Sequence, residues 1–215
     1  LKEFSDLITK KHKDKDGKVV YLYTSNKDAQ HMYVSKAQSK GYEVLVLDSP
    51  IVSHVIQKLE SKLDNASFVR VDSDIIDNLI KKEDKIESVL SEKDQNKLKP
   101  LFEKSLPSEG FVVSFDSLSP SSPPIAITQS EFMRRMKEMS LTGGGAMMGM
   151  GNMPDSYNLV VNTNHTLINK IHKLKGKQKQ DMIKKSIHLA LLANNLLKGE
   201  ALTNYIDRCF SDLSS

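Results

Sequence analysis

Methionine is the residue type in this sequence whose spacing most readily suggests chemistry, because seven of the nine methionines lie between residues 133 and 153. Thioether sulfur is a soft ligand that can bind Cu(I), but this stretch contains neither histidine nor cysteine to complete a copper site. Methionine also adapts to apolar partners of irregular shape, and the glycines at 143–145, 149 and 151 favour a pliable surface. The cluster therefore predicts a protein-binding surface. Its members are Met133, Met136, Met139, Met147, Met148, Met150 and Met153.

The remaining reactive side chains show no arrangement typical of catalysis. The six histidines are dispersed, and although His165 and His172 are seven residues apart, no cysteine or carboxylate joins them. The chain lacks the P-loop, dinucleotide-binding, zinc-protease and nucleophile-elbow motifs. The single cysteine, Cys209, lies on an apolar helical stripe, where we expect a small core residue. We therefore expect no enzymatic activity, metal or cofactor within these residues.

Composition and charge are ordinary for one large or two small globular domains: 215 residues, 39% hydrophobic, 27% charged and a net charge of +4. The densest basic stretch, residues 10–18, includes Asp14 and Asp16, which favours a solvated loop over a phosphate-binding site. We expect no nucleic-acid partner, and no apolar run is long enough for a membrane span. A lone cysteine fits a reducing, cytoplasmic location. Because the chain begins at Leu1 and not at Met, we expect a piece of a longer protein.

The first part of the chain alternates short apolar strands with amphipathic helices. Apolar runs at 19–23, 44–47 and 68–71 are typical of strands buried on both faces of a parallel sheet. Helical spacing between them predicts helices at 27–39 and 50–63. The residues expected to face the core are Met32, Val34 and Ala37 in the first helix and Ile51, Val55, Ile56, Leu59 and Leu63 in the second.

A second unit is expected beyond a strongly charged stretch, within which we place the boundary at residue 80. The predicted fold class is α/β plus α+β: a small three-layer α/β/α unit (βαβαβ) at residues 1–80, followed by an α+β domain at residues 81–215 that ends in dimerisation helices. The strands expected in the second domain are 111–115, 125–127 and 157–161, and the chain is expected to be helical from about 166 onward.

A helix with a strong start signal carries the first methionines of the cluster. Thr128 and Glu131 have the spacing of a capping box. The apolar residues that follow share one broad helical face. That face either packs in the protein's own core or binds a partner, and the glycine-rich segment behind it favours a partner. The predicted binding residues are Phe132, Met133, Met136, Met139 and Leu141.

Two apolar helices at the C-terminal end, residues 178–198 and 202–213, expose more apolar surface than one sheet can cover. One side can pack on their own sheet, and the other can pair with the same helices of a second chain in a four-helix interface. A helical hairpin buried within its own domain is the alternative. The predicted dimer-interface residues are Ile187, Leu191, Leu192, Leu196, Leu202, Ile206 and Phe210.

Three stretches resemble the heat-shock protein 90 chaperones. Residues 45–51 (LVLDSPI) with 56–59 (IQKL) resemble a segment near the end of that family's middle domain. Residues 160–167 (VVNTNHTL) are similar to its strand followed by N-x-x-H, and 190–193 (ALLA) to its dimerisation helices. Their order and spacing cover nearly the whole chain. Bacterial members fit best, because the chain does not end in the M-E-E-V-D tail of eukaryotic cytosolic members.

The resemblance implies the end of the middle domain and the C-terminal dimerisation domain of an ATP-dependent chaperone. Its partners would be a second copy of the chain and unfolded client proteins, held by the helix that carries Phe132, Met133 and Met136. ATP and magnesium would bind upstream, in parts of the parent protein that this chain lacks. His54 stands where family members often carry an exposed aromatic residue, which departs from the family's pattern.

Two other functions are consistent with the residues alone. The methionine-rich helix could pack at a fixed interface with one specific protein partner, which would make the chain a structural interaction module. The βαβαβ unit could also belong to an enzyme of unrecognised type, although no acid, base or nucleophile group is predicted at its strand ends, where ligands usually bind.

Overall fold

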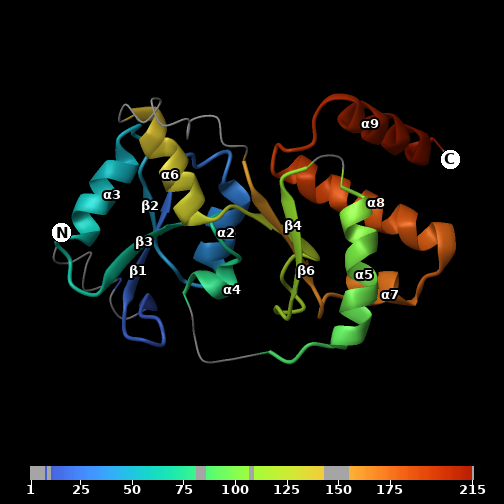
Figure 1. The fold of residues 1–215 in the computed structure, drawn as a ribbon, viewed down its shortest axis with the longest axis horizontal. Helices are drawn as coiled ribbons and strands as arrows, with labels where there is room; N and C mark the ends of the chain where they lie inside the picture. Colours follow the sequence, from blue (N-terminus) through green and yellow to red (C-terminus); the bar gives the residue numbers. More distant parts are fainter. Residues whose placement is uncertain (1–7, 9–10, 81–85, 107–108, 143–154, 215) are drawn as a thin grey trace. The chain divides into compact units, whose positions relative to one another are not determined.

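The chain folds with mixed α/β structure into two compact units in a computed structural model (Figure 1). Unit 1 combines Leu1–Asp84 with Thr128–Ser156, and unit 2 combines Lys85–Ile127 with Tyr157–Ser215. The first break is close to the expected boundary at residue 80, whereas Thr128–Ser156, which that boundary assigns to the second domain, belongs to unit 1. The structure describes residue 8 and residues 11–80, 86–106, 109–142 and 155–214.

Unit 1 contains the expected alternation of strands and helices around a three-stranded sheet of order β2-β1-β3. Both neighbours of β1 run parallel to it, with Leu22 opposite Val44 and Tyr21 opposite Phe68. The parallel pairing follows from the helical crossovers, since a helix between two strands returns the chain to the same edge of the sheet. The elements are β1 (Val19–Thr24), α2 (His31–Ser39), β2 (Val44–Val46), α3 (Val52–Glu60), β3 (Ala66–Arg70), α4 (Ile76–Leu79) and α6 (Glu131–Thr142).

The two faces of this sheet are covered differently. Val20 and Leu22 pack with residues of α2 and α4 on one face, while Tyr23 and Phe68 pack with Ile56 of α3 on the other. The helix α6 lies beside α3 on this second face (Figure 1). The face of α6 that turns inward therefore covers part of the sheet beside α3.

Several residues expected in the core of unit 1 are exposed instead. In α2, Val34 and Ala37 are buried as expected, but Met32 is exposed. In and around α3, Ile56 is buried, whereas the other four expected core residues are exposed. A three-stranded sheet is narrow, so only one residue of that apolar set reaches it. The exposed four are Ile51, Val55, Leu59 and Leu63.

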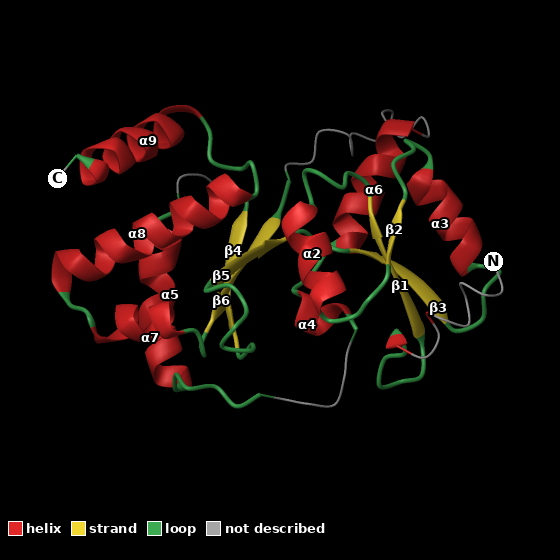
Figure 2. Ribbon diagram, turned by 180° about the vertical axis from the view of Figure 1, so that it is seen from behind, coloured by secondary structure: helices red, strands yellow, loops and turns green. Residues whose placement is uncertain are grey.

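Unit 2 is built on a second three-stranded sheet of order β4-β6-β5, with helices packed against it (Figure 2). Its core joins Phe102, Leu159 and Ile187, all fully buried, with further apolar residues of the sheet and helices. The strands agree closely with the expected ranges, because each is a short apolar run bounded by turn residues. The elements are α5 (Glu92–Lys104), β4 (Phe111–Asp116), β5 (Ile125–Thr128), β6 (Tyr157–Asn162), α7 (Thr166–Lys173), α8 (Gly176–Ala193) and α9 (Gly199–Leu213).

The stretch N-T-N-H, residues 162–165, forms the turn after β6, and its side chains hydrogen-bond to backbone groups. The side chain of buried Asn162 accepts from the Leu118 amide (3.3 Å) and donates to the Ser119 carbonyl (2.9 Å). Asn164 donates to the Leu118 carbonyl (3.1 Å) and accepts from a backbone amide in the loop before α5. His165 caps α7 by accepting from a backbone amide through Nδ1, and burial lowers its pKa, which favours the neutral ring that can accept. These residues hold loops together and need no ligand.

Candidate functional site

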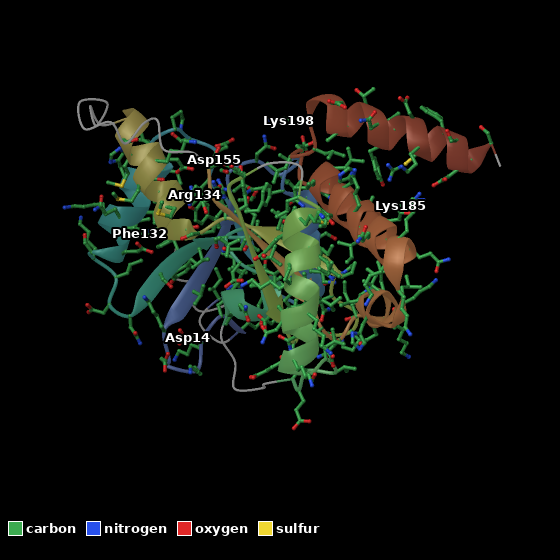
Figure 3. All side chains as sticks on the ribbon, turned by 45° about the vertical axis from the view of Figure 1, so that its right-hand side comes forward. Asp14, Phe132, Arg134, Asp155, Lys185 and Lys198 are labelled. Atoms are coloured by element: carbon green, nitrogen blue, oxygen red, sulfur yellow. The ribbon has the colours of Figure 1, made fainter. Side chains whose placement is uncertain are left out.

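Helix α6 presents its apolar residues to solvent. Phe132 is 68% exposed (Figure 3). Met133 and Met136 are exposed, and Met139 is half-buried. Of the five residues predicted to bind a partner, these four are therefore brought together on one helix. The fifth, Leu141, has a side chain outside the described part, and the later methionines of the cluster, Met147, Met148, Met150 and Met153, also lie outside the described residues.

The buried side of the same helix is charged. Arg134 is only 5% exposed and faces Tyr23 of β1. Burial and the neighbouring Glu131 raise the pKa of the Tyr23 hydroxyl, which keeps it protonated and able to donate to Glu131 at 2.9 Å. Burial also opposes ionisation of Glu138, but hydrogen bonds from Ser53 and Arg134 outweigh it and lower the Glu138 pKa. The alternative prediction is that the apolar face of α6 packs in the protein's own core. The structure differs from it, because the apolar residues are exposed and Arg134 is buried.

An apolar groove of about 450 Å³ lies between α3, β3 and α6. Phe68 and Val69 of β3 line it on one side, and Phe132, Met136 and Met139 of α6 on the other. Methionine and phenylalanine side chains at its rim can change rotamer to fit apolar segments of different shape. The groove and the exposed face of α6 form one continuous candidate site within unit 1.

The carboxyl end of the parallel sheet in unit 1 holds polar groups that pair with one another. Thr24 donates to the Gln30 side chain at 2.6 Å, and Gln30 donates to Asp72 at 2.6 Å. Asp72 also forms an ion pair with Arg70 at 2.5 Å. Ligands of α/β proteins usually bind at this edge, but here the acceptors are used for structural contacts. No group of three His, Cys, Asp or Glu among the described residues could hold a metal ion.

The seven residues predicted at a dimer interface divide into three groups. Ile187 and Leu191 are fully buried in the core of unit 2, so the structure corrects their placement on an outer surface. They belong to the face of α8 that covers its own sheet, a choice that helical periodicity cannot make. Leu196 and Leu202 pack against the same core and are partly buried. The three that remain exposed are Leu192, Ile206 and Phe210.

Helix α9 is the least covered element of unit 2. None of its residues is buried, and Phe210 is 65% exposed. Ile206, Phe210 and Leu213 recur at intervals of four and three, which places them on one helical face. Leu189 and Leu192 of α8 are also exposed. An apolar face of this kind is typical of a surface that another protein chain covers. No described helix is both long and apolar enough to cross a membrane.

His188 of α8 contacts α9, and we expect it to make the stability of the fold depend on pH. Its ring lies edge-on to Tyr205, with ring centroids 5.8 Å apart. Burial, with Lys184 and Arg208 nearby, lowers its pKa, so the folded protein favours the neutral ring. As the pH falls, the unfolded chain therefore binds a proton at His188 before the folded chain does. The contribution of neutral His188 to the stability of the fold is complete above pH 6.5 and is lost as the pH falls below that value.

We expect His188→Gln to reduce the fall in thermal midpoint between pH 7.5 and pH 5.5. The comparison concerns the slope with pH, so a uniform loss of stability in the variant does not affect it. His31→Gln, at an exposed position of unit 1, serves as the control and should keep the slope of the unaltered chain. An unchanged slope in the His188 variant would contradict this role.

Comparison with known proteins places the chain in a family. It matches the family model described as Hsp90 protein over residues 2–207. It is 46% identical over 172 residues to Chaperone protein HtpG of Porphyromonas gingivalis, which covers 79% of this chain and 25% of that protein. It is 34% identical over 276 aligned residues to the HtpG proteins of Bacteroides fragilis and Bacteroides thetaiotaomicron, covering 97% of this chain and 40% of each relative. The chain spans less than half the length of these relatives, and it belongs to the Hsp90 protein family.

Proposed function

We propose that this chain is the dimerisation and client-binding region of a molecular chaperone that assists protein folding. The observation that carries the proposal is the orientation of α6, which turns Phe132, Met133 and Met136 outward beside an apolar groove. Membership of the Hsp90 family and relatives named as chaperones support it. The whole chaperone is proposed to act in the cytoplasm.

ATP chemistry is assigned to the rest of a longer parent protein. The sequence contains no P-loop, and the polar groups at the strand ends of unit 1 are paired with one another. We therefore propose that this region binds proteins and that ATP and magnesium bind upstream in the parent.

An exposed phenylalanine and two exposed methionines suit a client that is partly unfolded. Such a client presents apolar segments without a fixed shape, and burying each large apolar side chain is worth about 1.5–3 kcal/mol. Flexible side chains allow many such segments to fit. A homodimer would carry two copies of the surface, so a client long enough to reach both would bind more tightly than to one.

The proposed dimer pairs the exposed faces of α8 and α9 with the same faces of a second chain. Leu192, Ile206 and Phe210 supply the apolar contacts, while Ile187 and Leu191 stabilise each chain's own core. A two-fold axis makes one patch serve both chains, so no second complementary surface is required.

Replacing Phe132, Met133 and Met136 together with serine should weaken binding of a partly unfolded protein by about tenfold or more, because the apolar contacts are lost. Fluorescence anisotropy with a labelled, permanently unfolded client measures the change, and sedimentation checks that dimerisation is intact. Val112→Ser, at an exposed apolar position of β4, is the matched control and should bind normally.

Unchanged affinity in the triple variant would contradict the assignment of α6 as a client-binding helix. Binding by the unaltered chain should extend to several unrelated unfolded proteins. If only one partner among many were bound, the chain would instead be a dedicated interaction module for that partner.

A further inference from the structure

The residues that α6 turns inward occupy the positions at which a packed helix normally carries apolar side chains. Glu131, Arg134, Arg135 and Glu138 are spaced i, i+3, i+4 and i+7, which puts them on one face. Arg134 and Ser140 are the buried residues among 131–140, and no apolar side chain of that range is fully buried. The helix is thus docked on unit 1 by charged groups.

Arg134 connects the helix to the central strand. Its guanidinium donates to Glu131 at 2.6 Å, to Glu138 and to the hydroxyl of Tyr23. The same group lies 5.8 Å from the centre of the Tyr23 ring. Its Nε finds no acceptor among the described residues, so the buried charge is held with one donor unsatisfied. This cost is tolerated only while the other partners stay in place.

Arg135 connects the helix to the edge strand and to α3. It pairs with Glu60 of α3 at 2.8 Å and with Glu131 at 2.7 Å, and it also donates to the Phe68 carbonyl. Glu131 in turn accepts from the backbone amide of Arg70 at 3.2 Å. Four charged residues of α6 therefore reach β1, β3 and α3, whose contacting residues are more than 60 positions away in the sequence.

Charge contacts of this kind can specify one orientation while adding little net stability. A buried ion pair returns little net free energy compared with an apolar contact of similar size, but removing one partner is strongly destabilising. Without these contacts, the favourable way to place α6 on the sheet would be with Phe132, Met133 and Met136 inward.

We propose that Arg134 and Arg135 are positioning residues that dock α6 on unit 1 with its apolar face outward. The biological purpose of this docking rests on the proposed client-binding function, whereas the docking itself can be measured without a client. The ion pair between Glu60 and Arg135 is the best point of attack, because its two residues come from α3 and α6.

The test is a charge swap read by amide hydrogen exchange over residues 132–142 of the full chain. Glu60→Arg and Arg135→Glu should each speed exchange of these amides by about tenfold or more, because each places like charges together. The double variant should recover most of the protection. Recovery cannot be complete, because Arg135 also contacts Glu131 and the Phe68 carbonyl, and because Glu60 also accepts from the Phe68 amide. Lys137→Glu is the control, since Lys137 pairs with Asp155 at the solvent-exposed side of the same helix.

Client binding is measured on the same variants. Affinity should fall in each single variant and return in the double variant, a pattern that general damage to the fold would not produce. If Glu60→Arg fails to fold because Glu60 also accepts the Phe68 amide, Tyr23→Phe and Arg135→Gln carry the exchange test. Unchanged exchange in the single variants, or no recovery in the double variant, would overturn the proposal. Failure of the triple serine variant to weaken client binding would instead overturn the proposed function and leave the exchange result standing.

Discussion

The chain carrying Phe210→Glu is expected to sediment as a monomer at micromolar concentration, where the unaltered chain is expected to sediment as a dimer. Phe210 is exposed on a helix that has no buried residue within its own chain. A dimer that covers it would have to bury the new carboxylate without a partner, which should raise Kd by about a hundredfold or more. Sedimentation velocity over a concentration series measures the change.

Val112→Glu provides the matched control for this experiment, because Val112 is an exposed apolar residue of the same unit on β4. It should remain dimeric. A monomeric unaltered chain at the same concentrations would refute the proposed dimer. If the Phe210→Glu variant remained dimeric with an unchanged Kd, the interface would have to lie outside α9.

The second large effect concerns the core of unit 2. Ile187→Ala should lower the free energy of unfolding by about 2–5 kcal/mol, because it removes buried methylenes and leaves a cavity. Ile187 is fully buried beside Phe102 and Leu159. Urea unfolding, monitored through hydrogen exchange of the β6 amides, measures the loss of unfolding free energy in unit 2. The measurement is made in the Phe210→Glu background so that dimerisation does not contribute.

Leu189→Ala is the control for Ile187→Ala, since Leu189 lies on the same helix and is exposed. In the monomeric background it should change the free energy of unfolding by no more than about 0.5 kcal/mol. If Ile187→Ala left stability unchanged but weakened the dimer in the otherwise unaltered chain, Ile187 would belong to the interface, as the sequence pattern predicts.

Local signals account for the parts of the fold that the sequence predicts well. The strands β1, β4 and β6 coincide with short apolar runs, and the helices α2 and α3 coincide with segments of helical spacing. The resemblance to the Hsp90 family also rests on local stretches, such as residues 160–167. The structure adds why that stretch is built as it is, since Asn162 and Asn164 hydrogen-bond to loops about 40 to 75 residues away.

The dimer-interface residues show where local signals stop. Ile187, Leu191 and Leu192 all fit the apolar pattern of one helix, yet the first two are in the core and the third is exposed. Periodicity gives the angle of each residue around the helix axis. It does not give the direction in which the sheet lies, and α8 is apolar over too much of its circumference for the pattern to decide.

Residue types and spacing alone predict that α6 is a helix with one apolar and one charged face, rich in methionine. The predicted capping box is not formed, because Thr128 belongs to β5 and Glu131 bonds instead to Tyr23 and the Arg70 amide. That the charged face lies inward, and that the helix belongs to unit 1, follows only from the folded structure. The charged face can lie inward because a charge can be buried when partners satisfy it. For Arg134 and Arg135 those partners include Tyr23 and Glu60, which the chain brings close only when it folds.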